Sequence, residues 1–256
     1  MRLGIPLSSS KTQHYVNQAY VQYVAESGFD PILIPPELPV DTALDSFDGL
    51  VLPGGIDLDP IFYGEDNYTS YSSDPDKDEF ERKLFHAVRL AGMPIFGICR
   101  GFQLIAREYL ESDENMDEFL EFETHISSHN QVSDQTLARN IHQHFVDYVP
   151  AVLYGGDSNE VLSAPVNSMH HQCLIADFKR RGVLGVRAFR MAAWTRRGLK
   201  LKSKKGSYPV VCEAFRILKW GAPILAVQWH PEEIRDHELL RQFFNAGTKT
   251  KALETT

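Results

Sequence analysis

The stretch Gly97-Ile98-Cys99-Arg100-Gly101 combines a nucleophile with the small residues that a sharp turn requires. Cys99 directly follows an apolar, strand-like run and directly precedes a segment with helical spacing. Such a strand–turn–helix forms a nucleophile elbow, where flanking glycines leave room for the turn. The N-terminus of the following helix lowers the pKa of a thiol, and its N–H groups can stabilise an oxyanion. The pattern predicts a nucleophilic Cys99, although a buried structural cysteine would have the same local sequence.

A cysteine nucleophile needs a general base, and the base needs a partner that orients it. His230 follows the apolar run ILAVQW and precedes Pro231 and Glu232. A carboxylate two residues after a histidine can accept a hydrogen bond from one ring nitrogen and leave the other nitrogen facing the sulfur. The chain has ten histidines, so the strand-end position and the nearby carboxylate are what single out this one. We predict a catalytic triad of Cys99, His230 and Glu232.

Short apolar runs alternate with helical patterns and must position these residues. Strand-like runs cover residues 3–7, 31–36, 48–55, 93–99 and the segment PILAVQWHPE of 223–232. Helical spacing covers residues 12–27, 74–92, 101–110 and about 232–246. This alternation predicts an α/β fold with a mostly parallel central sheet, helices on both faces and a smaller antiparallel hairpin region. Ligand sites of such sheets lie beyond the carboxyl ends of the strands, where the PGG of 53–55 and Cys99 fall.

The composition is that of a globular protein: 256 residues, 43% hydrophobic and 23% charged. Three widely spaced cysteines without a C-x-x-C pair argue against a disulfide framework or a zinc site and favour a reducing compartment. A net charge of −8 argues against general nucleic-acid binding. We find no signal-peptide pattern and no apolar run near the roughly 20 residues that span a bilayer. We therefore expect a cytoplasmic protein with no membrane partner.

Domain organisation follows from the absence of repeats and low-complexity linkers. One domain over residues 1–246 with a flexible tail over residues 247–256 is the simplest organisation. The oligomeric state is not predictable from the sequence.

Three blocks, in this order, resemble the signature blocks of class I glutamine amidotransferases: PGG (53–55), GICRGFQ (97–103) and QWHPE (228–232). Within that superfamily the chain is most similar to the γ-glutamyl-γ-aminobutyrate hydrolase family. The further matching segments are LPGGIDLDPIFYGE (52–65), DKDEFE (76–81) and VNSMHHQ (166–172). The resemblance spans roughly residues 1–110 and 160–246, and it implies a flavodoxin-like fold.

The resemblance also implies roles for residues outside the triad. The backbone N–H groups of Gly55 and Arg100 would form the oxyanion hole, and Gln103 would help to bind the glutamyl group. A polar set would border the substrate pocket: Asn167, Ser168, His170, His171 and Gln172. A hydrogen-bonded loop would explain the same polar run. The chemistry needs no metal and no organic cofactor.

Two segments depart from the family pattern. After the elbow helix, relatives usually have a Gly-Gly turn, whereas residues 107–122 read REYLESDENMDEFLEF, which is acidic and lacks glycine. Between Lys179 and Lys205 there are eleven Lys or Arg and no Asp or Glu, a pattern that suggests a long basic hairpin with a turn near Lys204 to Ser207. Such a hairpin could dock an acidic partner enzyme, a phosphorylated acceptor or nucleic acid. A solvated edge hairpin that blocks aggregation is an equally good interpretation.

Three functions fit these features. The first is a hydrolase that cuts a γ-glutamyl amide through a glutamyl thioester and releases glutamate and an amine, as the family-level blocks favour. The second is a glutaminase subunit that delivers ammonia to a separate acceptor enzyme, which Gln103 and the basic hairpin favour. The third is a non-catalytic scaffold on the same fold, which the intact triad disfavours. The substrate is in every catalytic case a small γ-glutamyl amide or glutamine.

Overall fold

The computed structural model describes ten stretches of the chain. They are residues 1–56, 58–59, 73–112, 120–123, 139–155, 157–170, 172–177, 185–186, 188–195 and 209–254. Among these residues, no helix combines the length and the apolar character that crossing a bilayer requires. Most of the predicted basic hairpin, including its turn near Lys204, lies outside the described residues.

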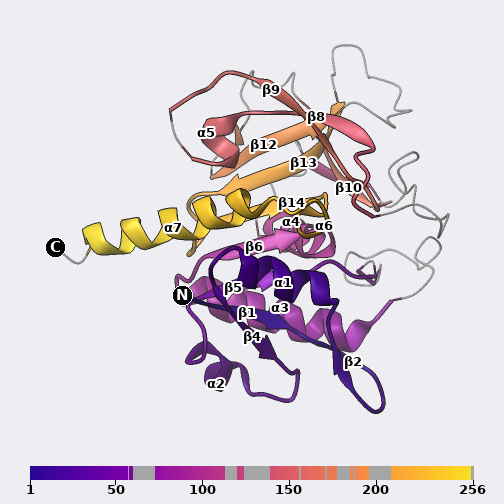
Figure 1. The fold of residues 1–256 in the computed structure, drawn as a ribbon, viewed down its shortest axis with the longest axis vertical. Helices are drawn as coiled ribbons and strands as arrows, with labels where there is room; N and C mark the ends of the chain where they lie inside the picture. Colours follow the sequence, from indigo (N-terminus) through magenta and orange to yellow (C-terminus); the bar gives the residue numbers. More distant parts are fainter. Residues whose placement is uncertain are drawn as a thin grey trace.

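Five parallel strands form one half of the main sheet (Figure 1). In spatial order they are β4 (Asp30–Ile34), β1 (Arg2–Pro6), β5 (Gly49–Leu52), β6 (Ile95–Ile98) and β14 (Ile224–Val227). β5, β6 and β14 are buried at every position, as expected for parallel strands covered on both faces. Val227 pairs with Ile98, so the residues after β14 lie beside those after β6.

The other half of the sheet is antiparallel and begins where β14 pairs with its next neighbour. In spatial order after β14 come β13 (Pro209–Ile217), β12 (Phe189–Thr195), β8 (His144–Tyr148) and β9 (Leu162–Val166). Three more strands attach to this half: β10 (Cys173–Asp177), β7 (Leu120–Glu123) and β11 (Gly185–Val186). A separate ribbon pairs β2 (Ser8–Ser9) with β3 (His14–Tyr15).

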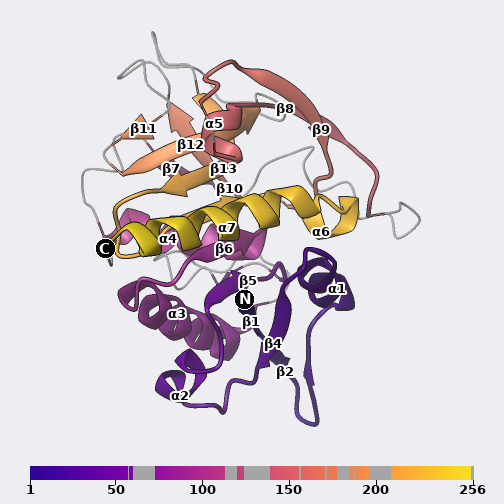
Figure 2. The same cartoon turned by 60° about the vertical axis from the view of Figure 1, so that its left-hand side comes forward.

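Helices cover both faces of the sheet. One face carries α2 (Val40–Leu44), α3 (Pro75–Leu90) and α4 (Arg100–Glu111), and the other carries α1 (Gln18–Glu26) and α7 (His237–Glu254). Strand residues alternate between the two buried clusters: Leu50 and Leu52 of β5 belong to the α3–α4 side, and Val51 belongs to the α1–α7 side. Figure 2 shows α7 lying along the sheet. Two single-turn helices are α5 (Pro150–Leu153) and α6 (Pro231–Ile234).

Local sequence sets the ends of α3, the helix that carries the DKDEFE segment. Asp74 caps its N-terminus by accepting a hydrogen bond from the Lys77 N–H at 3.1 Å. Pro75 occupies the first turn, where its missing N–H is no loss. Gly92 follows the helix with a φ of 69°, a conformation that suits glycine. The start and end of this helix therefore agree with the sequence-based prediction.

The α/β fold, with its parallel central sheet and helices on both faces, is confirmed. The antiparallel part is larger than the predicted hairpin region, because irregular segments between its strands left no periodic signal. The helix predicted over 232–246 is two helices, separated by Arg235 in the left-handed conformation at a φ of 57°. α7 continues to Glu254 rather than ending near residue 246. The single domain and the flexibility of residues 247–256 stay predictions.

We expect α7 to stabilise the fold through the residues that it buries against the sheet. Leu240 of α7 is fully buried, and Leu240→Ala should lower the free energy of unfolding by about 2–5 kcal/mol. Leu90 at the end of α3 is 75% exposed, and Leu90→Ala should change it by less than about 0.5 kcal/mol. Urea unfolding of both variants checks the contrast. Equal losses would contradict the packing of α7 against the sheet.

Candidate active site

Cys99 occupies a sharp turn between β6 and α4. Its φ of 51° is positive, which is uncommon for a residue with a side chain. A Cβ atom on Gly101 would lie 2.4 Å from the Leu52 carbonyl oxygen, and one on Gly97 would lie 2.6 Å from Ile105 Cδ1. Both positions therefore require glycine. The structure has the nucleophile elbow that the sequence predicts.

His230 and Glu232 form a buried hydrogen-bonded pair next to this turn. Nδ1 of His230 donates to Oε1 of Glu232 at 2.6 Å, and Cys99 is near enough to the ring to raise its pKa. Burial lowers the pKa of His230, but the negative charges of Glu232 and Cys99 outweigh it and raise that pKa to about 10. His230 therefore keeps its proton at neutral pH. The three predicted triad residues lie together, with the protonated ring of His230 hydrogen-bonded to Glu232 and close to Cys99.

The Gly54–Gly55 turn after β5 closes over the elbow. A Cβ atom on Gly54 would lie 3.4 Å from Cys99 Cβ and 2.9 Å from His230 Cε1, and one on Gly55 would lie 3.4 Å from Arg100 Cδ. Arg100 is the first residue of α4, where a backbone N–H has no partner within the helix. The two predicted oxyanion donors, Gly55 and Arg100, are therefore neighbours, and Gly54 of the same turn lies against Cys99. Their catalytic role stays a prediction.

The Arg100 side chain anchors the elbow to α3. It is 1% exposed and forms ion pairs with Asp78 and Glu81. Lys77 lies 3.4 Å from Glu81, and Asp78 accepts a hydrogen bond from the Asp59 N–H at 2.9 Å. Removing one partner of such a buried pair typically costs about 3–5 kcal/mol, because the other charge is left uncompensated. The DKDEFE segment thus holds the residue that follows the nucleophile.

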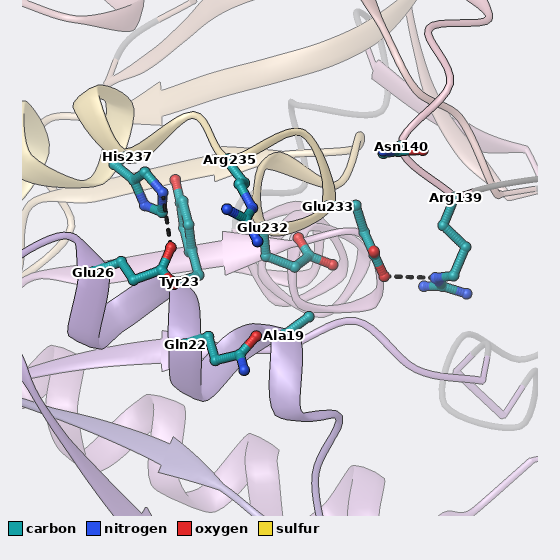
Figure 3. Close-up of a pocket in the computed structure, with 10 residues that line it drawn as sticks. All are labelled: Ala19, Gln22, Tyr23, Glu26, Arg139, Asn140, Glu232, Glu233, Arg235 and His237. Atoms are coloured by element: carbon teal, nitrogen blue, oxygen red, sulfur yellow. Dashed lines mark hydrogen bonds and ion pairs between the residues drawn. The ribbon is translucent and has the colours of Figure 1, made fainter.

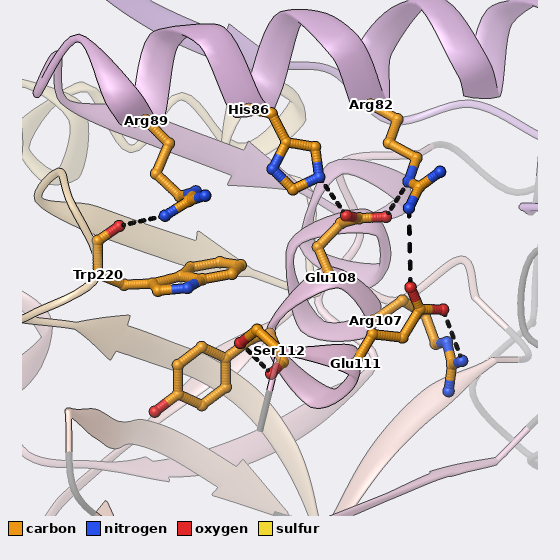
Figure 4. A network of polar contacts seen from close by, with 9 residues as sticks. Arg82, His86, Arg89, Arg107, Glu108, Glu111, Ser112 and Trp220 are labelled. Atoms are coloured by element: carbon orange, nitrogen blue, oxygen red, sulfur yellow. Dashed lines mark hydrogen bonds and ion pairs between the residues drawn. The ribbon is translucent and has the colours of Figure 1, made fainter. Parts of the chain in front are cut away.

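A second set of contacts joins α3 to the far end of α4 (Figure 4). Arg82 Nε donates to Glu108 Oε1 at 2.7 Å, and His86 hydrogen-bonds to the other oxygen of Glu108. The Arg89 guanidinium lies over the Trp220 ring, 4.5 Å from its centroid. Contacts at both ends of α4 therefore fix the elbow helix against its neighbour.

A family model described as peptidase C26 matches residues 6–232. The chain belongs to the peptidase C26 family. A glutamine amidotransferase-like protein of Rickettsia prowazekii is 26% identical over 90% of this chain and 86% of its own length. The γ-glutamyl-γ-aminobutyrate hydrolase of Escherichia coli O157:H7 is 29% identical over 40% of this chain and 43% of its own length.

Other curated relatives of this peptidase C26 member match only in part. A candidate glutamine amidotransferase of Mycobacterium tuberculosis is 36% identical over 36% of this chain and 31% of its own length. The chain spans half or less of the first curated relatives that it matches.

Solved structures share the fold of this C26 chain at low sequence identity. A candidate GMP synthase component from Thermoplasma acidophilum is 16% identical with a TM-score of 0.59, covering 100% of this chain and 98% of that one. The glutaminase domain of Trypanosoma brucei CTP synthase, with bound acivicin, is 13% identical with a TM-score of 0.56, covering 97% and 94%. These structures support the fold alone.

Asn167 hydrogen-bonds to the backbone of His230, the predicted base. Its Oδ1 accepts from the His230 N–H at 3.0 Å, and its Nδ2 donates to the His230 carbonyl at 3.1 Å. Nδ2 also donates to the Arg139 carbonyl at 3.0 Å. This reciprocal pair fixes the backbone of His230 from a strand end 63 residues earlier. The sequence analysis placed Asn167 at the border of the substrate pocket and did not predict its hydrogen bonds to His230.

The other predicted substrate residues are mostly buried near the elbow. Gln103 donates to the Gln172 carbonyl at 3.4 Å, and that carbonyl also hydrogen-bonds to His170 Nδ1 at 3.0 Å. Ser168 is fully buried, and His171 lies outside the described residues. The structure brings Gln103, His170 and Gln172 together. Contact with substrate stays a prediction for all of them.

Sequence reasoning missed a buried carboxylate beside this polar run. Glu213 of β13 hydrogen-bonds to His144 at 3.0 Å, and His170 lies 3.9 Å from the same oxygen. Glu213 interrupts an apolar strand, VVCEAF, and a charge at a fully buried strand position is the signal that could have found it. It supports the loop that carries Asn167 and Gln172.

A cavity of about 360 Å³ lies beside Glu232 (Figure 3). Residues of α1 and α6 and the turn at Arg139 line it. Two ion pairs cross its wall, one between Arg139 and Glu233 at 2.6 Å and one between His237 and Glu26 at 3.2 Å. Cys99 does not line this cavity. The cavity is therefore not where a substrate would meet the sulfur.

The raised pKa of His230 gives a direct test of the triad. The imidazolium contributes stability that is complete below the ordinary pKa near 6.5 and is lost as pH rises through about 10. Glu232→Gln removes the main charge that raises this pKa, so the titration midpoint of the His230 ring should fall toward or below 6.5. Nitrogen NMR of the ring measures it. Glu233→Gln is the matched control and should leave the midpoint near 10.

Proposed function

We propose that this C26 protein hydrolyses the side-chain amide of a γ-glutamyl compound through a glutamyl thioester on Cys99, releasing glutamate and an amine or ammonia. The observation that carries the proposal is the elbow cysteine beside a protonated His230, which is hydrogen-bonded to Glu232. The names of several relatives, which are glutamine amidotransferase-like proteins or γ-glutamyl-γ-aminobutyrate hydrolases, support the same reaction class.

In the first half of the reaction, the Cys99 thiolate attacks the amide carbonyl carbon. A C–S bond forms, and the carbonyl electrons move onto oxygen. The N–H groups of Gly55 and Arg100 are the proposed donors to this oxyanion, and one such donor is typically worth about 3 kcal/mol. His230 then gives its proton to the nitrogen, the C–N bond breaks and the amine leaves. A histidine that is charged at neutral pH is suited to this step.

In the second half, water attacks the thioester carbonyl. His230, now neutral, accepts a proton from the water, and the C–S bond breaks as glutamate forms. The sulfur leaves as a thiolate beside the imidazolium, which restores the starting ion pair. No step requires a metal or an organic cofactor.

Gln103 is the proposed contact for the glutamyl portion. It lies one helical turn after Cys99 and is fully buried, and its N–H donates to the Cys99 carbonyl at 3.0 Å. Its Oε1 has no hydrogen-bond partner among the described residues. A buried amide oxygen without a partner costs about 1–3 kcal/mol. The ammonium group of a bound glutamyl substrate would supply the missing donor.

We expect purified protein to release glutamate from L-glutamine or from γ-glutamyl-γ-aminobutyrate, and Cys99→Ser to lose this turnover. Acid-quenched protein should carry one glutamyl group on the Cys99 peptide, detected by mass spectrometry. Cys212→Ala is the control and should keep turnover, because Cys212 is buried in the core and burial raises its pKa well above the ordinary thiol value.

Three outcomes separate the candidate functions. Turnover of γ-glutamyl-γ-aminobutyrate but not of L-glutamine supports the hydrolase. Weak glutaminase activity that rises when an acceptor enzyme is added supports the role of ammonia supplier instead. Absence of turnover and of any Cys99 adduct with both compounds would contradict the catalytic proposal.

A further inference from the structure

Tyr20 of α1 contacts the turn that carries the proposed oxyanion donor. The side chain is buried, and its hydroxyl oxygen accepts a hydrogen bond from the Gly54 N–H at 3.0 Å. Gly54 immediately precedes Gly55. A tyrosine on the buried face of an amphipathic helix is ordinarily interpreted as core packing, so the sequence pattern does not reveal this contact.

Three active-site groups surround the Gly54 Cα atom. A Cβ atom placed there would lie 2.4 Å from the Tyr20 hydroxyl oxygen, 2.9 Å from His230 Cε1 and 3.4 Å from Cys99 Cβ. The phenol, the imidazole and the nucleophile therefore meet at one backbone position. A displacement of any one of them moves the turn relative to the other two.

The Tyr20 hydroxyl lies close to the charges of the triad. Burial raises the pKa of Tyr20 well above its usual value, and the adjacent negative charges of Glu232 and Cys99 raise it further. The phenol is therefore neutral, and its oxygen can accept the hydrogen bond from the Gly54 N–H.

We propose that Tyr20 is a positioning residue that holds the Gly54–Gly55 turn beside His230, so that the oxyanion donor and the base keep a fixed spacing. This inference rests on the proposed function. The spacing matters most in the tetrahedral states, when the oxyanion and the proton transfer are both present. Loss of the hydroxyl should therefore slow the chemical steps more than it weakens substrate binding.

Tyr20→Phe and Tyr23→Phe form a matched pair of tests. Tyr23 is also buried on α1, but its hydroxyl donates to the Asp236 carbonyl at 2.7 Å, away from the Gly54–Gly55 turn. Tyr20→Phe should lower kcat about 10- to 100-fold with little change in KM, the scale of one lost hydrogen bond. Tyr23→Phe should lower the melting temperature at least as much as Tyr20→Phe does, and it should leave kcat within about twofold of the wild-type value.

Hydrogen exchange provides a readout that a purely structural role would not move. In Tyr20→Phe the Gly54 amide loses its acceptor, so it should exchange at least about tenfold faster than in the wild type, and in Tyr23→Phe its rate should not change. Wild-type kcat in Tyr20→Phe, or equal loss of kcat in the two variants, would overturn the positioning role while leaving the proposed function intact. A wild-type protein without turnover on any γ-glutamyl amide would overturn both.

Discussion

Cys99 has a backbone conformation that costs a non-glycine residue on the order of 1–3 kcal/mol, and the surrounding packing must hold it there. The approach of α4 to β5 is so close that Gly101 has no room for a side chain against Leu52. The same closeness fixes the first N–H of α4 beside the Gly54–Gly55 turn. The strained turn therefore sets the geometry of the sulfur, the proposed oxyanion donors and the helix together.

Two buried sets of charges meet at this turn. His230 and Glu232, which lie beside Cys99, form the first set, and Arg100 with its partners on α3 forms the second. Each set pairs its charges internally, which limits the cost of removing them from water. Because Cys99 and Arg100 are consecutive, the second set fixes the backbone on which the first depends. An alteration of Asp78 would therefore disturb the backbone of Cys99 without touching its sulfur.

The sequence predicts those parts of the site whose residues lie close together along the chain. The glycines around Cys99 and the two-residue interval from His230 to Glu232 are local requirements, and the structure has both arrangements. Asn167 and Tyr20 act on residues distant in the chain, through hydrogen bonds that no periodic pattern encodes. Likewise, the parallel strands were predictable from their alternation with helices.

The antiparallel half and the break between α6 and α7 were not predictable in this way. The strands of that half are separated by chain segments of irregular length. The helix break occurs at an arginine in the left-handed conformation, where glycine would be the usual signal in a sequence. The catalytic roles of the individual site residues remain predictions.

The order of strands has a consequence for how the protein is made. β6 and β14 are neighbours in the sheet, yet β6 ends at Ile98 and β14 begins only at Ile224. A ribosome completes Cys99 well before it completes β14, His230 and Glu232. A nascent chain therefore has its sulfur long before it has the proposed base. On the proposed mechanism, the insertion of a late strand into the middle of the sheet would be the step that makes the cysteine reactive.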